Sequence, residues 1–189
     1  MTTPKRSRAQ ALLRLAIRVA PRERADWLEA MAAEIDHVPD ASVQRFAIGC
    51  LTTAVRTRIA SPAFILASTH LTLVFGALAW AALNLWFAGR MSSADAAGPE
   101  MFGYSIAAAF AFGALATARF GFRAVLGLGA PLLAVLGLSA LAIKLLLPYS
   151  AVNALYFALI VEDIATLLLA LGIAFAIPRL VAIRQATGQ

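Results

Sequence analysis

Four long apolar segments after residue 60 constrain this chain more than any other feature. A helix needs about 20 apolar residues to cross the hydrocarbon core of a bilayer, which is roughly 30 Å thick. We expect the four crossings at residues 63–88, 101–118, 124–147 and 151–177. Proline and glycine lie between these segments, where the chain has to turn. The sequence therefore predicts an all-α fold with an integral membrane four-helix bundle.

The charged residues divide the chain into parts that face different solvents. Ten of the sixteen Lys and Arg and six of the ten Asp and Glu precede residue 61. The whole chain is 61% hydrophobic and 14% charged, whereas a soluble domain is about half apolar and a quarter charged. We therefore expect a cytosolic helical domain at residues 1–60, a membrane domain at 61–178 and a cytosolic tail at 179–189.

The basic residues also predict the orientation of the bundle. Lys and Arg collect on the cytoplasmic side of membrane helices. Here they flank the predicted spans at residues 56–58, 119–123 and 179–184, which all lie on one side of a four-helix topology. We therefore expect a multi-pass protein of a bacterial inner membrane with both termini in the cytoplasm. Trp80 and Trp86, towards the outer end of the first span, are expected to be interfacial anchors.

Residues 7–60 have the periodicity of three short amphipathic helices, with Pro21 in the first turn of the second helix and Asp40 as N-cap of the third. A segment this short buries too little apolar surface to be comfortably stable alone, so we expect it to pack on another surface. The lipid leaflet, a second copy of the chain and a soluble protein are the candidates. The residues expected to bind a partner, unless they form the core of this segment, are Trp27, Met31, Ile35, Phe46 and Leu51.

A family resemblance is carried by residues 10–38. The sequence Leu12-Leu13-Arg14-Leu15, then Pro21-Arg22, then Trp27 to Met31 with Glu34 and Ile35 resembles the short helical domains that precede bacterial transmembrane segments. These include the HAAS-type domains linked with PadR-type transcription regulators and the prefix domains of some permeases. Anti-sigma factors have a similar arrangement, although the zinc-binding Cys and His pattern of many of them is missing here. The resemblance implies a membrane-anchored signalling module whose cytosolic helices bind a regulator.

Two adjacent acidic residues interrupt the fourth predicted span near its middle. Glu162 and Asp163 point about 100° apart on a helix, so we expect only one of them to face the bundle. A charge costs about 2.5–3.5 kcal/mol at that depth, so at least one of the two is expected to be protonated. Of the two candidate partners of Glu162, Lys144 ranks above His70, which should lie at a different depth, although a Lys near the end of a span extends more readily outward to the interface.

Three interpretations of this acidic pair remain open. The carboxyls are an assembly device that pairs with a basic group, or they form a proton or cation site in a small transporter centred on Glu162. In the third interpretation the fourth span is displaced: Glu162 and Asp163 mark an interfacial break and the crossing begins at Ile164.

Several function classes find no support in the sequence. It contains no nucleotide-binding, hydrolase or metalloprotease motif, and one cysteine with two histidines is too few for a zinc site. We therefore expect neither enzymatic activity nor a cofactor or metal. The pI of about 10.4 follows from the basic cytoplasmic flanks, so we do not expect nucleic acid as a partner. The favoured interpretation is a membrane protein whose cytosolic helices dock a soluble regulator, with a small transporter as the alternative.

Overall fold

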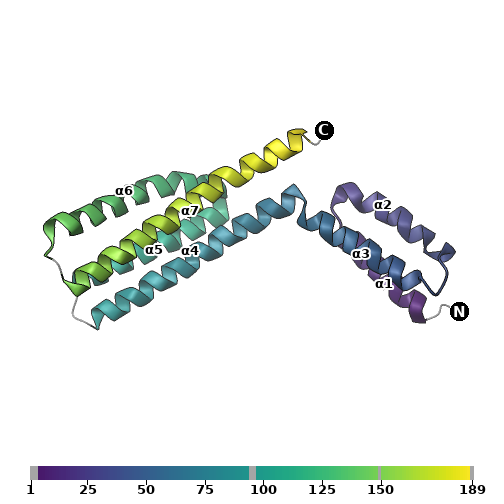
Figure 1. Cartoon of the computed structure of the whole chain (residues 1–189), viewed down its shortest axis with the longest axis horizontal. Coiled ribbons are helices and arrows are strands. Elements are labelled where there is room, and N and C mark those ends of the chain that lie inside the picture. Colours follow the sequence, from purple (N-terminus) through teal and green to yellow (C-terminus); the bar gives the residue numbers. More distant parts are fainter. Residues whose placement is uncertain (1–3, 94–96, 149, 188–189) are drawn as a thin grey trace. The chain divides into compact units, whose positions relative to one another are not determined.

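The fold is helical throughout the part that the structure describes. The computed structural model describes residues 4–93, 97–148 and 150–187, and these contain no strand (Figure 1). The chain divides into two compact units, Met1–Ile65 and Leu66–Gln189. This confirms the predicted fold class of short N-terminal helices followed by long apolar ones.

The N-terminal unit consists of three α-helices and one 3-10 turn. Its elements are α1 (Pro4–Val19), α2 (Arg22–Ala33), η1 (Glu34–His37) and α3 (Val43–Ile59). Helix α1 packs along α3, and α2 packs on α1. Pro21 is the N-cap of α2, where its missing N–H costs no helical hydrogen bond.

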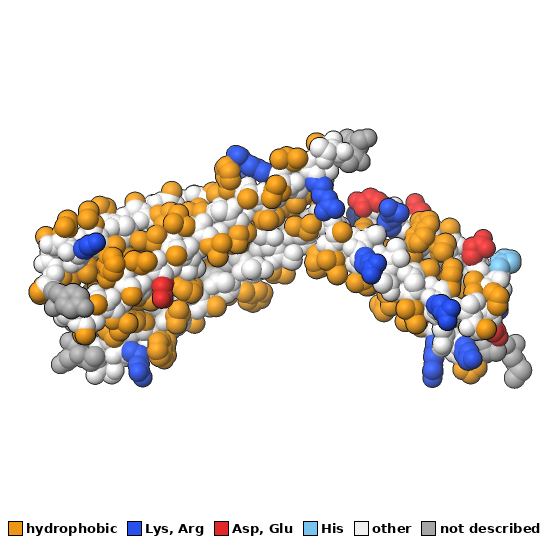
Figure 2. All heavy atoms as spheres, in the orientation of Figure 1, with side chains coloured by type: hydrophobic (Ala, Val, Ile, Leu, Met, Phe, Trp, Pro, Cys, Tyr) orange, Lys and Arg blue, Asp and Glu red, His pale blue; other side chains and the backbone are white. Residues whose placement is uncertain are grey.

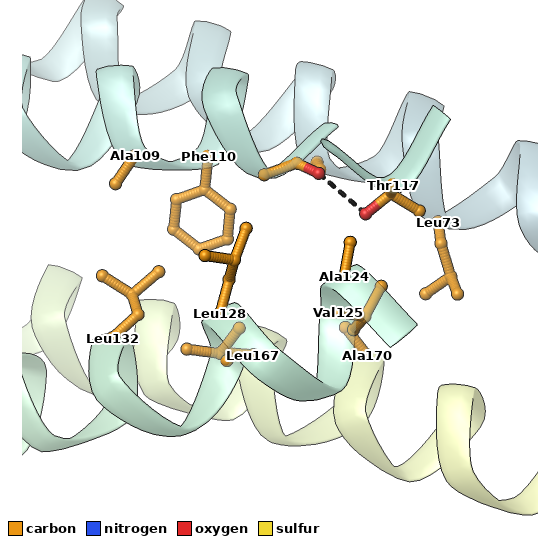
Figure 3. Close-up of a pocket in the computed structure, with 13 residues that line it drawn as sticks. Leu73, Ala109, Phe110, Thr117, Ala124, Val125, Leu128, Leu132, Leu167 and Ala170 are labelled. Carbon is orange, nitrogen blue, oxygen red and sulfur yellow. Dashed lines mark hydrogen bonds between the residues drawn. The ribbon is translucent and has the colours of Figure 1, made fainter. Parts of the chain in front are cut away.

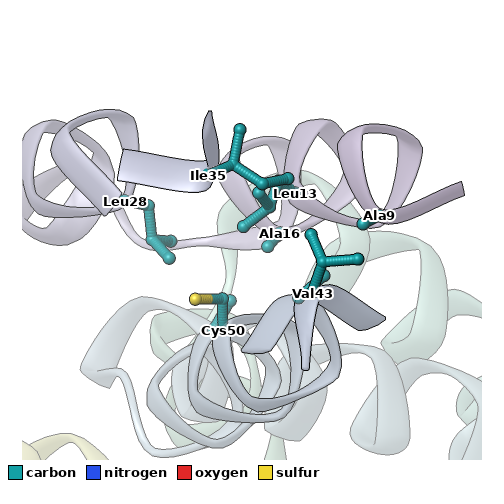
Figure 4. Close-up of a cluster of buried hydrophobic side chains, with 9 residues drawn as sticks. Ala9, Leu13, Ala16, Leu28, Ile35, Val43 and Cys50 are labelled. Carbon is teal, nitrogen blue, oxygen red and sulfur yellow. The ribbon is translucent and has the colours of Figure 1, made fainter. Parts of the chain in front are cut away.

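A closed apolar core holds this unit together (Figure 4). The residues of α1 that reach the core are small or aliphatic and recur one turn apart, which is why α1 approaches α3 closely. The buried side chains are Ala9, Leu13, Ala16, Leu28, Ile35, Val43, Ala47, Cys50 and Ala54.

Asp40 has a different role from the predicted one. The N-cap of α3 is Ser42, and Asp40 instead accepts a hydrogen bond of 2.6 Å from Nε of Arg6. The same guanidinium donates to the carbonyl of Val38 at 3.2 Å and lies 3.5 Å from Asp36. The prediction was wrong because the Arg6 side chain offers this carboxylate a charged donor, which binds more strongly than a backbone N–H.

Four long helices form the second part of the chain. They are α4 (Pro62–Ser92), α5 (Ala97–Phe120), α6 (Phe122–Leu146) and α7 (Ala151–Thr187). Each is long and apolar enough to cross a membrane. Gly121, with φ of +67°, makes the single-residue turn between α5 and α6, a conformation in which a Cβ would be strained. The chain is thus a multi-pass membrane protein.

The outer surface of these four helices is apolar. Figure 2 shows hydrophobic side chains over most of the visible face of the bundle, with few charged ones among them. Large side chains such as Phe75, Leu115, Leu138 and Leu169 are more exposed than buried. Exposure of so large an apolar surface to water is energetically unfavourable, whereas lipid acyl chains solvate it.

Helix α7 is longer than the sequence predicted. Pro178 was expected to end it, yet the helix continues to Thr187. A proline inside a helix removes one backbone hydrogen bond, and membrane helices tolerate that loss when the neighbouring turns remain paired. Beyond the proline, the Arg179 guanidinium lies 3.7 Å from the centre of the Phe175 ring, a contact that spans this turn of the helix.

Candidate functional site

The acidic pair of α7 is divided between the inside and the outside of the bundle. Asp163 is completely buried, with 0% of its surface exposed. Its neighbour Glu162 is exposed on the outer surface of the helix. The carboxyl that interacts with the other helices is therefore that of Asp163, and a site centred on Glu162 would face away from the bundle.

Two donors from α4 hold one oxygen of Asp163. Trp80 Nε1 donates to Oδ1 over 2.6 Å, and Asn84 Nδ2 donates to the same oxygen over 3.0 Å. Trp80 and Asn84 are four residues apart, so they occupy one face of α4. Asn84 also donates to the backbone carbonyl of Trp80 at 3.2 Å, which fixes the orientation of its amide.

This arrangement corrects the prediction for Trp80. Its indole N–H points to Asp163 inside the bundle, so Trp80 is not an interfacial anchor. A buried carboxyl is a stronger acceptor for the indole N–H than interfacial water. Residue spacing along α4 could not predict this contact, because the acceptor lies on another helix. Trp86 does lie on the exposed side of α4, with the Arg90 guanidinium 5.4 Å from its ring centre.

The other oxygens of this pair have no partner. Asp163 Oδ2 and Asn84 Oδ1 are both buried, and neither accepts a hydrogen bond from the described residues. Leaving a buried polar atom unpaired costs about 1–3 kcal/mol. Two such acceptors on contacting side chains mean that the site lacks a donor or a positive charge.

Apolar side chains surround the pair on the other helices. Ile160 and Leu167 flank Asp163 along α7, and the same cluster contains Ile106 of α5 and Leu136 of α6. One turn further from Ile160, the Tyr156 ring meets the Phe102 ring edge-on, with 5.0 Å between ring centres. The carboxyl therefore lies in a medium of low polarity.

The site lies far from both ends of the helices that form it. Asp163 is twelve residues from Ala151, the first residue of α7, and Trp80 is twelve residues from Ser92, the last residue of α4. A rise of 1.5 Å per residue places both about 18 Å from those ends. The two helices thus bring their polar groups to one level, well away from the helix ends.

A close approach of α4 and α5 supports the site from one side. A Cβ at Gly103 would lie 3.0 Å from the Cβ of Ala88 and 3.3 Å from the Asn84 carbonyl oxygen. Glycine therefore allows α5 to pack directly on the turn of α4 that carries Asn84. This contact involves the backbone of Asn84, so it brings α5 to the level of the site.

The remaining polar residues predicted inside the membrane lie apart from Asp163. Lys144 is exposed near the end of α6 and makes no ion pair with Glu162 among the described residues. Glu162 points out of the bundle, so the ranking of Lys144 above His70 as its partner stays a prediction. The ring nitrogen Nε2 of His70 lies 2.7 Å from the carbonyl oxygen of Thr117, so α4 and α5 are also joined at a second level.

An apolar cavity of about 70 Å³ lies between the helices (Figure 3). Leu73, Phe110, Leu128 and Leu132 form much of its wall. The Thr117 hydroxyl, at one end, donates to the Gly113 carbonyl over 2.7 Å and is not directed at a ligand. The cavity can accommodate small apolar groups, but its walls offer little to orient a polar substrate.

The residues predicted to bind a partner have different positions in the N-terminal unit. Ile35 is buried in its core, and Met31, Phe46 and Leu51 pack partly against that core. Trp27 alone among these five has 43% of its surface exposed. The expectation that Ile35 faces a partner is corrected, because η1 turns it inward after α2 ends.

Other exposed apolar residues were missed by sequence reasoning. Leu15, Ile48, Val55 and Ile59 remain exposed after the core is complete. The predicted amphipathic periodicity of residues 7–60 did not show which edge of each apolar face lies outside the core. Helical spacing predicts which apolar residues stay exposed only once the position of α1 on α3 is known.

Cys50 lies in the same core as Leu13 and Leu28. Burial raises the pKa of its thiol above the ordinary value, so the group remains a neutral, small apolar side chain. Within the described residues, no three His, Cys, Asp or Glu side chains are grouped to hold a metal ion.

Comparisons with known proteins add no relative to this description. No family model, no curated protein and no solved structure matches the chain. The functional argument therefore rests on the residues themselves.

Proposed function

We propose that this chain is a non-enzymatic, membrane-anchored adaptor whose N-terminal unit binds a soluble regulatory protein in the cytoplasm. The observation that carries the proposal is the indole of Trp27 on α2, of which 43% is exposed. The four-helix bundle anchors the unit in the bacterial inner membrane, with both termini in the cytoplasm.

The position of Trp27 is typical of a binding residue. Helix α2 contributes Leu28 to the core, while the adjacent Trp27 points outward. A large aromatic side chain exposed to water gains much from burial, and tryptophan is enriched among the residues that dominate binding energy at protein interfaces. The unit does not need this side chain for its own core.

The charges around Trp27 favour a basic protein as the partner. Glu23, Asp26 and Glu29 are exposed on α2 together with Arg22 and Arg24, so three acidic side chains against two basic ones leave the helix a net charge of −1. Acidic side chains are repelled by the negative surface of a cytoplasmic leaflet, whereas they steer a basic protein into contact. A soluble regulator with an apolar pocket inside a basic rim would fit this surface.

Crosslinking from the full-length chain in its native membrane tests this proposal. A photoreactive amino acid replaces Trp27, and a matched chain carries it at Arg45, which is exposed on α3. We expect position 27 to capture one soluble protein and position 45 to capture it far less. The double substitution Glu23→Lys and Asp26→Lys should reduce that yield about tenfold, which corresponds to about 1.4 kcal/mol of lost attraction.

Other adducts would contradict the adaptor proposal. Products with lipid alone would show that α2 lies on the membrane surface. Products with a second copy of this chain would show that the acidic surface is a self-association site. Equal yields from both positions, unaffected by charge reversal, would show that contact with the captured protein is nonspecific.

A further inference from the structure

The hydrogen-bond pattern around Asp163 is unbalanced in one direction. Both donors that reach the carboxyl, Trp80 Nε1 and Asn84 Nδ2, bind Oδ1. The two atoms left over, Asp163 Oδ2 and Asn84 Oδ1, are both acceptors and both buried. A further acceptor cannot satisfy either of them, so the missing component is a hydrogen or a cation.

We propose that Asp163 and Asn84 form a proton-binding site, in which Oδ2 of Asp163 holds the proton and Oδ1 of Asn84 accepts its hydrogen bond. This inference concerns the bundle alone and does not depend on partner binding by the N-terminal unit.

The chemistry of the two side chains supports this assignment. A neutral carboxylic acid and a carboxamide are complementary: the amide N–H donates to one acid oxygen, and the acid O–H donates to the amide oxygen. The first of these bonds is present at 3.0 Å between Asn84 Nδ2 and Asp163 Oδ1. An ionised carboxylate has no hydrogen for the second bond, so only the protonated acid uses both groups fully.

A metal ion fits the site less well than a proton. Hard cations such as Ca²⁺ take six to eight oxygen ligands, and Mg²⁺ takes six. Here only two oxygens are unpartnered, one from each side chain. A proton needs one atom to hold it and one to accept it, which is what the pair supplies.

The charges near Asp163 also favour the neutral acid. Trp80 and Asn84, its polar neighbours from α4, are uncharged, and the one titratable group that acts on it electrostatically is the adjacent Glu162, a second acid. Tyr156, two turns earlier on α7, is the other titratable group of this core, and the members of the cluster on α5 and α6 are apolar. No cation among the described residues compensates a charge on Asp163. A negative charge there would cost about 2.5–3.5 kcal/mol.

The bound proton has a structural consequence. With it, the acid and the amide attract at two points and tie α7 to α4. Without it, the Oδ2 of a carboxylate and the amide Oδ1 of Asn84 are two unpaired acceptors in a low-polarity medium, and the contact weakens. Packing of α7 on α4 therefore becomes dependent on pH.

Infrared spectroscopy of the full chain in lipid nanodiscs tests the proton directly. A protonated carboxylic acid has a C=O stretch that is separate from the carboxylate bands. At neutral pH we expect a component of this band that shifts when aspartate is labelled with ¹³C, is absent from Asp163→Asn and is retained in the matched variant Glu162→Gln. Aspartate labelled with ¹³C should shift the band in the unsubstituted chain, which keeps the test valid if Asp163→Asn does not fold. Carboxylate bands alone at neutral pH would overturn the proposal.

Fluorescence of Trp80 separates a proton from other occupants of the site. The substitutions Trp27→Phe and Trp86→Phe leave Trp80, which donates to Asp163, as the single tryptophan. We expect its emission to change as alkaline pH removes the proton, both with and without Glu162→Gln, and to stay constant in Asp163→Asn, which has no acid to ionise. Replacing choline chloride by sodium chloride at fixed pH should have no effect. A sodium-dependent shift, or emission that is independent of pH in the otherwise unsubstituted chain, would overturn the proton site.

Discussion

The N-terminal unit and the four-helix bundle place their polar groups on opposite sides. In the N-terminal unit the buried core is apolar, and the charged side chains lie at its surface. In the bundle the described buried polar side chains are Asn84, Thr117 and Asp163, while leucine and phenylalanine cover the outside. The helices are alike in backbone, so the difference shows that the surrounding solvent selects which side chains point inward.

The two regions also gain stability differently. In the N-terminal unit, folding removes apolar surface from water, which stabilises the fold by about 25 cal/mol for each Å² buried. In lipid the outside is as apolar as the inside, so the helices rely on close packing and on hydrogen bonds between side chains. This accounts for the Gly103 contact with Ala88 and for the Asp163 network, for which the N-terminal unit has no buried counterpart in its described part.

The largest expected effect comes from opening the core of the N-terminal unit. Leu13 is almost completely buried, so Leu13→Ala should lower the free energy of unfolding of this unit by about 2–5 kcal/mol. Leu15, two residues away and 47% exposed, provides the matched control, and Leu15→Ala should change stability by less than about 0.5 kcal/mol. Amide hydrogen exchange of α1 and α3 in the full chain measures both. Similar protection in both variants would show that this core does not stabilise the unit.

A charge on the outer surface should distinguish the two regions most clearly. Leu138, which is 67% exposed on α6, faces lipid if the bundle crosses the membrane. Leu138→Arg should then oppose insertion by up to about 2.5–3.5 kcal/mol, less if the side chain reaches the interface. The same change at Leu15 should be nearly neutral, because a surface position in water tolerates a charge.

Membrane integration of the two arginine variants in a translocon assay compares these costs. A Leu138→Arg chain that integrates as well as the parent would place α6 in water. Such a result would remove the solvent difference between the two regions.

Much of this fold could be predicted from the sequence, because hydrophobic length and periodicity carry it. Three short helices precede four long apolar ones, as predicted, and the turn at Gly121 lies between two predicted spans, where the chain was expected to turn. Helix ends were less predictable. Pro178 did not end α7, because one lost hydrogen bond is small beside the pairing of the turns around it.

The candidate site could be predicted only in part. Two adjacent acids in an apolar span drew attention to Glu162 and Asp163, and their angular separation implied that one would face inward. Which one does so depends on the rotation of α7 against α4, and this is set by contacts between residues about eighty positions apart. Asn84 and Trp80 gave no local signal, since an amide or an indole in a span is unremarkable until a carboxyl faces it.

A smaller effect is expected from the surface of the N-terminal unit. Arg6 joins the start of α1 to the segment before α3 through Asp40, Asp36 and the Val38 carbonyl. Because the carboxylates are well exposed, Arg6→Ala should cost no more than about 1 kcal/mol, and salt should reduce that cost further. Urea titration at low and high salt measures this, with Arg8→Ala as the exposed control. A loss as large as that of Leu13→Ala would place this contact among the core interactions.

Cys50 offers the smallest perturbation, because labelling reads its environment without a substitution. Its thiol is buried in the apolar core of the N-terminal unit, and this burial raises the pKa of the thiol. The reactive thiolate is therefore scarce at neutral pH. The control is a chain with Gly49→Cys and Cys50→Ala, because the space beside Gly49 is open. Iodoacetamide should modify Cys50 at least about tenfold more slowly than the thiol at position 49. The thiol holds its proton more tightly in the folded state than in the unfolded state. The neutral thiol therefore contributes its full stability below the ordinary thiol pKa, and this contribution is lost as the pH rises through the raised pKa of the folded state. Equal labelling rates at the two positions would mean that α3 does not keep its inner face closed. The contrast between a wholly apolar core here and a bundle core that contains a buried polar pair would then no longer hold.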